Sequence, residues 1–166
     1  MNKGCWLLFL GFALALPSAC SSDAKDHDNS CQPDDQDGTV GGTMTVLLTV
    51  SDTAFAVGAP GSGSTQRNIT VENSSTVKLT VTNVGKEPHS FVVTCIPSGL
   101  PAACSQTSCF PDEAKIPAID PGDSVSVTFD TPAVEGAYQF TSDVDGDTTT
   151  DKQGKVTGLV GQFVLT

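Results

Sequence analysis

The stretch Val81–Cys95, VTNVGKEPHSFVVTC, decides the fold. The residues that lead into it, Thr76–Thr82, alternate apolar and polar side chains, which is typical of a half-buried β-strand. Gly85 and Pro88 then force a turn, and the apolar residues that follow His89 form a second strand. The sequence therefore places a histidine on a tight turn between two strands, at one end of a sheet.

This turn resembles the cupredoxin (blue-copper) family, in which a strand that ends in Asn leads through a short loop into the first copper histidine. Asn83 and His89 match that pattern. Three later segments are similar to further motifs of the family, in the same order. Ile116–Phe129 is similar to I-x-PG-x-S-x-x-x-x-F, Glu135–Ser142 to G-x-Y-x-F-x-C, and Gly158–Leu165 to GM-x-G-x-x-x-V. The resemblance covers residues 43–166 and implies a cupredoxin-like domain.

The residues themselves also indicate an all-β domain. Alternating segments separated by turn signals predict a Greek-key β-sandwich of about seven or eight strands. No segment keeps a 3.6-residue apolar period, so we expect at most one helical turn, near Asp112–Lys115. The expected core residues are Val46, Leu48, Val77, Leu79, Val81, Phe91, Val93, Val125, Val127, Phe129, Tyr138, Phe140, Leu159, Phe163 and Leu165.

The resemblance implies a type 1 copper site, but most of the expected ligands are missing. Such a site needs two imidazoles, a thiolate and usually a weak axial thioether. Ser142 stands at the thiolate position, Leu159 falls near the axial position, and no histidine follows Asp143. Two interpretations of His89 stay open. It binds copper with unusual partners, Cys95 among the candidates, or it caps and packs its turn without metal.

An acidic loop replaces the segment that would carry the remaining copper ligands. Asp143, Asp145 and Asp147 alternate, and Asp151 follows at the ninth position, which resembles part of a calcium-binding loop. The glycine of such a loop comes two positions early here, and Gly154 stands where the final Glu belongs. The alternatives are therefore a weak calcium site, an adhesive loop, or a solvated acidic loop.

The N-terminus predicts export. Residues 1–19 combine Lys3 with an apolar run, Trp6–Leu16, that is too short to span a membrane, which is typical of a signal peptide. Pro17–Cys20 resembles a bacterial lipobox, so we expect Cys20 to carry lipid and anchor the chain to a membrane. A plain secretory signal is the alternative. Residues 20–42 are then a lipidated, disordered polar tether, and the domain spans residues 43–166.

Four cysteines remain once the signal is removed and Cys20 is lipidated. An even number in an exported chain indicates two disulfides among Cys31, Cys95, Cys104 and Cys109. We predict that Cys95 pairs with Cys104 or Cys109, and that the other one pairs with Cys31. The spacing of Cys104 and Cys109 does not match paired zinc ligands.

Charge and residue content narrow the function. The formal net charge of −11 disfavours nucleic acid and anionic lipid surfaces as partners, and it leaves either steering toward a basic protein partner or simple solubility. No nucleophile lies in a recognisable arrangement with a base, so no enzyme is expected. We expect a non-enzymatic cell-envelope lipoprotein, facing the periplasm or the cell surface, with a binding or structural module and no resident cofactor. The alternative is a copper-binding or electron-transfer protein that uses His89.

Overall fold

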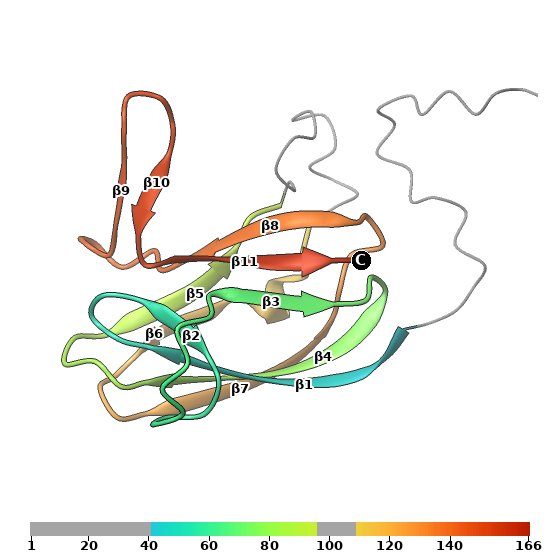
Figure 1. The fold of residues 1–166 in the computed structure, drawn as a ribbon, viewed down its shortest axis with the longest axis horizontal. Helices are drawn as coiled ribbons and strands as arrows, with labels where there is room; N and C mark the ends of the chain where they lie inside the picture. Colours follow the sequence, from blue (N-terminus) through green and yellow to red (C-terminus); the bar gives the residue numbers. More distant parts are fainter. Residues whose placement is uncertain (1–40, 96–108) are drawn as a thin grey trace, which may run out of the picture.

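Two β-sheets face each other in the computed structural model, which describes residues 41–95 and 109–166 (Figure 1). One sheet has the order β2-β1-β4-β7 and the other β3-β11-β8-β5-β6, with a separate pair of β10 and β9. The strands are β1 (Gly41–Val50), β2 (Phe55–Val57), β3 (Asn68–Val71), β4 (Ser75–Asn83), β5 (His89–Val93), β6 (Ile116–Ile119), β7 (Ser124–Asp130), β8 (Gly136–Thr141), β9 (Thr148–Thr150), β10 (Val156–Gly158) and β11 (Val160–Leu165).

Strands far apart in the sequence lie side by side, which confirms the all-β sandwich. β1 runs parallel to β4, with Leu48 opposite Val81, and β3 runs parallel to β11. β4 also pairs with β7 in antiparallel fashion, with Leu79 opposite Val127. The alternation of β4 turns its apolar residues toward the other sheet and its polar residues outward. Because β4 pairs with both β1 and β7, its alternation sets which residues of the first sheet face the core.

The core is rich in aromatic side chains. Phe55, Phe91 and Phe140 pack against one another, with ring centroids 5.0–6.2 Å apart. Val125 and Val127 are only partly buried, because β7 is the edge strand of its sheet; Phe129, farther along the same strand, is buried. The core also contains residues that the sequence did not predict: Val50, Phe55, Ile69, Val71, Phe110, Ala114, Ile116, Ile119 and Val134. Most of them lie on strands or turns too short to show an alternating pattern.

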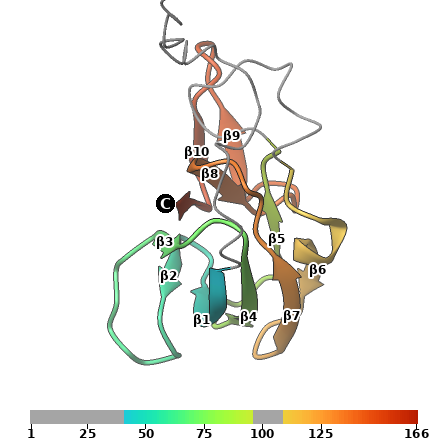
Figure 2. The same ribbon diagram turned by 90° about the vertical axis from the view of Figure 1, so that its right-hand side faces the viewer.

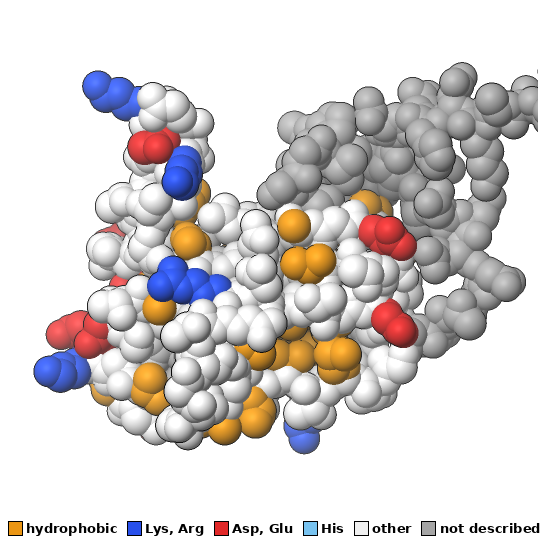
Figure 3. Space-filling model, viewed as in Figure 1, with side chains coloured by type: hydrophobic (Ala, Val, Ile, Leu, Met, Phe, Trp, Pro, Cys, Tyr) orange, Lys and Arg blue, Asp and Glu red, His pale blue; other side chains and the backbone are white. Residues whose placement is uncertain are grey.

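The described residues contain more strands than the seven or eight expected. β2, β9 and β10 have three residues each, and β9 and β10 form a hairpin that projects from the sandwich (Figures 1 and 2). The turn between the two strands contains Lys152 and Lys155, and basic side chains are visible at the hairpin tip (Figure 3). The expected helical turn is a short 3-10 helix, η2 (Asp112–Ala114).

A disulfide joins Cys95 to Cys109, one of the two pairings predicted for Cys95. Cys20, Cys31 and Cys104 lie outside the described residues, as do the signal peptide and the tether. β1 is described from Gly41 onward, and the domain boundary expected at residue 43 stays a prediction. Within residues 41–95 and 109–166, no helix is long and apolar enough to cross a membrane.

Candidate functional site at one pole of the sandwich

Asn83 organises the turn that presents His89. It ends β4 and is fully buried, and its side-chain amide donates to the backbone oxygens of Glu87 and Ile119 at 2.8 Å each. Its Oδ1 accepts a hydrogen bond from the backbone N–H of Gly85, also at 2.8 Å. One side chain therefore satisfies three backbone groups, as asparagine does in many tight turns. The turn is fixed before any contact of the histidine is considered.

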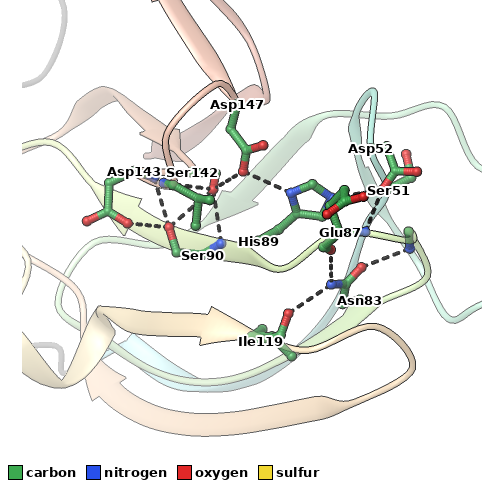
Figure 4. A network of polar contacts seen from close by, with 12 residues as sticks. Ser51, Asp52, Asn83, Glu87, His89, Ser90, Ile119, Ser142, Asp143 and Asp147 are labelled. Carbon is green, nitrogen blue, oxygen red and sulfur yellow. Dashed lines mark hydrogen bonds and ion pairs between the residues drawn. The ribbon is translucent and has the colours of Figure 1, made fainter.

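His89 is buried between two carboxylates. Its side chain is 1% exposed, its Nδ1 lies 2.8 Å from Oδ2 of Asp147, and its Nε2 lies 3.2 Å from Oδ1 of Asp52 (Figure 4). Asp52 comes from the turn after β1, and Asp147 comes from the loop between β8 and β9. The imidazole therefore links three loops at one pole of the sandwich.

Ser142 lies directly beside this contact. Its hydroxyl donates to the same Oδ2 of Asp147 that faces His89, and it accepts a hydrogen bond from the backbone N–H of Ser90 at 3.0 Å. The hydroxyl of Ser90 in turn donates to Asp143 (Figure 4). The residue at the thiolate position of the resemblance thus belongs to the same polar network as the histidine. We refer to Asp52, His89, Ser90, Ser142, Asp143 and Asp147 as the pole network.

Two backbone N–H groups stabilise the ionised form of the Asp52 side chain. Its Oδ1 accepts hydrogen bonds from the N–H groups of Lys86 at 2.7 Å and Glu87 at 3.2 Å. These two bonds, followed by the hydrogen bond with His89, lower the pKa of the Asp52 carboxyl below its ordinary value. Asp52 is therefore a carboxylate at neutral pH, and its side chain is 40% exposed to solvent.

The four aspartates of the expected calcium loop are not gathered around one point. Asp147 turns toward His89, whereas Asp143 contacts Ser90. Asp151 closes its own turn by accepting hydrogen bonds from two backbone amides at the hairpin tip, at 2.9 Å each. Asp145 is exposed. In the described part of the chain, no group of three or more His, Cys, Asp or Glu side chains is placed to hold a metal ion.

The donor set at the pole does not fit type 1 copper. Such a site needs a thiolate, and Ser142 offers a hydroxyl that is already hydrogen-bonded. Both ring nitrogens of His89 face carboxylates, and Leu159, near the expected axial position, is buried and has no donor atom. Cys95, the candidate replacement thiolate, is in a disulfide. The other side-chain donor atoms of this pole are mainly carboxylate and hydroxyl oxygens.

Two members of the network escaped the sequence analysis. Asp52 and Ser90 carry no motif, and Asp52 meets His89 across 37 positions of the chain. The signal in the sequence is weak. Asp52 lies in a polar turn directly after a strong strand, and Ser90 follows His89 in a run that is otherwise apolar. Only the pairing of the sheets brings these two positions to the same pole.

Solved structures share the sandwich. Rusticyanin from Thiobacillus ferrooxidans superposes with a TM-score of 0.50 at 18% identity, covering 75% of this chain and 77% of its own. Auracyanin from Roseiflexus castenholzii gives 0.49 at 18% identity, covering 76% and 99%. Auracyanin A, a "blue" copper protein from Chloroflexus aurantiacus, gives 0.46 at 17% identity, covering 75% and 99%. At such identities only the fold is shared, and it is the cupredoxin-like sandwich.

Comparison at the level of sequence gives a family. No curated protein matches the chain. The family model CARDB, which describes Ig-like domains, matches residues 54–153, more than half of the chain. Ig-like and cupredoxin-like domains are both Greek-key sandwiches of two sheets, so this match and the structural likeness are compatible. The chain belongs to the CARDB family.

Proposed function

We propose that the protein is a non-enzymatic, exported lipoprotein whose cupredoxin-like sandwich acts as a binding or structural module without type 1 copper. One observation carries the proposal: His89 is enclosed by Asp52 and Asp147, and Ser142 shares Asp147 with it. A site of this kind satisfies its own donors and acceptors. Its physical role is to hold three loops together at the pole.

The same geometry supports a non-enzymatic role. Ser142, Asp147 and His89 are the residue types of a hydrolytic triad, but their hydrogen bonds do not run from serine to histidine to carboxylate, as those of a triad do. The serine hydroxyl donates to the carboxylate and has no hydrogen bond to the imidazole, so no base is placed to take its proton. Ser142 and His89 are each 1% exposed, which leaves little access for a substrate.

Export to the cell envelope rests on the sequence and on one feature of the fold. The apolar run and the lipobox-like Pro17–Cys20 predict processing and a lipid anchor. The Cys95–Cys109 disulfide supports an oxidising compartment, because cytosolic thiols are usually kept reduced. Globomycin treatment of cells that express the full chain tests the anchor, since it should cause accumulation of the uncleaved form. Unchanged processing in the presence of globomycin would contradict the anchor.

Copper binding through His89 with unusual partners is the second candidate. The observation that favours it is the position of His89 beside Ser142, on a fold shared with rusticyanin. To bind a metal, a ring nitrogen of His89 would have to give up a carboxylate.

Metal content distinguishes the two candidates. The protein is expressed in a periplasm and purified without chelators. Copper, zinc and calcium are then measured per chain, and a visible spectrum is recorded after Cu²⁺ is added. We expect no stoichiometric copper and no intense blue band. Stoichiometric copper that disappears in His89→Ala would replace the first proposal by the second.

A further inference from the structure

A cavity separates β2 from the loop that follows it. The loop of residues 58–67 bows away from the sheet (Figure 2), and the space that it encloses with β2 and the end of β1 has a volume of about 330 Å³. This lies at the lower end of the roughly 300–1,000 Å³ found for small-molecule sites. The cavity is separate from the buried contacts of the pole network, although Ser51, next to Asp52, lines it.

The lining combines one cation, several hydroxyl groups and apolar surface. Arg67 is the only arginine of the chain, and it lines the cavity together with Ser62, Ser64 and Thr65. Apolar side chains, including the half-exposed Val84, complete the wall. A cation and hydroxyl donors beside apolar surface suit a small molecule that has an anionic head and an aliphatic part.

The donors of this cavity are available. The hydroxyls of Ser62 and Ser64 accept backbone N–H groups at 3.4 and 3.3 Å, and within residues 41–95 and 109–166 no acceptor takes their protons. The Arg67 guanidinium likewise has no ion-pair partner in the described part of the chain. Ser51 differs, because its hydroxyl donates to Ala54 O at 3.1 Å. The free donors therefore gather on the loop side of the cavity.

The loop is held in place by its own backbone. Val57 N–H donates to Gln66 O at 2.7 Å, which closes the loop at its base, and Gly58 N–H donates to Leu47 O at 2.8 Å. Gly58 has a φ of 135°, and a Cβ there would meet Oγ of Ser62 at 2.6 Å, so the loop requires glycine at this position. A binding surface that is already formed loses less entropy when it takes a ligand.

We propose that this cavity binds a small organic carboxylate through Arg67 and the hydroxyls of Ser62, Ser64 and Thr65. A guanidinium presents two parallel N–H groups that match a carboxylate, and the apolar wall accommodates a short aliphatic tail. A neutral sugar fits less well, because sugar sites commonly offer an exposed aromatic face, whereas Phe55, the aromatic residue of this lining, is fully buried. The inference rests on the proposed binding role and gives it a ligand class.

The test titrates the ¹⁵N-labelled full-length protein with butyrate and follows its amide resonances. Butyramide has the same shape without the charge, and inorganic phosphate carries charge without the tail. We expect butyrate to shift the amides of Gly61, Gly63 and Ser64, and the two comparison compounds to bind more weakly. Arg67→Gln should weaken butyrate binding roughly tenfold, because it removes a charge-assisted bidentate contact. Lys78→Gln, the same change at an exposed cation outside the cavity, should leave it unchanged.

Several results would overturn the inference. These are equal binding of butyramide, unchanged binding by Arg67→Gln, tighter binding of phosphate, or no shifts at concentrations far above millimolar. Arg67 is exposed, and its structural bond is made by its backbone oxygen, which accepts Gln162 N–H at 3.1 Å, so the variant should fold. The amide spectrum itself reports folding. A negative result with butyrate would not affect the proposal that the module lacks type 1 copper, because metal content and the visible spectrum decide that proposal.

Discussion

Replacing His89 by alanine should cost the domain about 3 kcal/mol of unfolding free energy. The contact of Nδ1 with Asp147 at 2.8 Å is a hydrogen bond to a charged group, for which about 1.5–3 kcal/mol is typical. Truncating a side chain that is 1% exposed also leaves a cavity and removes a polar partner from Asp147. The contact with Asp52 adds less, because solvent reaches that carboxylate.

Urea unfolding at neutral pH, followed by circular dichroism, measures this loss. Lys78→Ala, at an exposed position of β4, is the control and should stay within about 0.5 kcal/mol of the parent. Combining His89→Ala with Asp147→Ala in a double-mutant cycle should give a coupling energy of at least about 1 kcal/mol. A loss below about 1 kcal/mol for His89→Ala, or additive effects in the cycle, would refute the view that the network holds the pole together.

Three further predictions concern the same domain. Ser142→Cys should not give a blue protein when Cu²⁺ is added, because a type 1 site needs a second imidazole and residues 143–166 contain no histidine; an intense visible band would contradict this. Asp52 has a lowered pKa in the folded state, so its contribution is present above the unfolded value of about 3.9 and is lost as the pH falls through the folded pKa. Asp52→Asn should therefore flatten the acid side of a plot of unfolding free energy against pH. An unchanged slope would argue against a lowered pKa of Asp52 in the folded state. Removing the Cys95–Cys109 disulfide with a double serine variant should destabilise the domain by about 3 kcal/mol, because the bond closes a loop with a sequence separation of 14; equal denaturant midpoints would contradict this.

The strongest strands were predictable because their side chains alternate over many residues. β4 shows this best, since its buried and less buried positions alternate along its whole length. β2, β9 and β10 were not predictable from periodicity, because three residues cannot establish a period of two. They form only where a longer neighbour or a tight turn holds them, which is a tertiary effect.

The candidate site divides along the same line. Residues 83–89 form a local motif, so the turn and its histidine could be located from the sequence. The partners of the histidine could not, because Asp147 lies 58 positions away and meets it only after β5 and β8 have paired. The alternating aspartates of residues 143–147 suggested a shared cation, whereas the structure directs one of them to His89 and another to Ser90. Charge pattern alone did not distinguish these outcomes.

The pole network and the proposed carboxylate cavity meet at one turn. Ser51 lines the cavity. The next residue, Asp52, is hydrogen-bonded to His89 and to the backbone of the turn that contains Gly85. Gly85 has no room for a side chain, because a Cβ there would collide with Asp52 and approach Nε2 of His89 to 3.0 Å. The turn that contributes Ser51 to the cavity is thus packed closely against the histidine turn.

This arrangement gives the network a role beyond stability. In the described residues, every buried side-chain nitrogen and oxygen has a hydrogen-bond partner, so the pole is complete as a set of protein contacts. If the network positions the Ser51–Asp52 turn, His89→Ala should weaken butyrate binding even though His89 does not line the cavity. Unchanged butyrate affinity in a folded His89→Ala variant would show that the two features are independent. A weakened affinity would mean that the pole network supports a neighbouring binding surface.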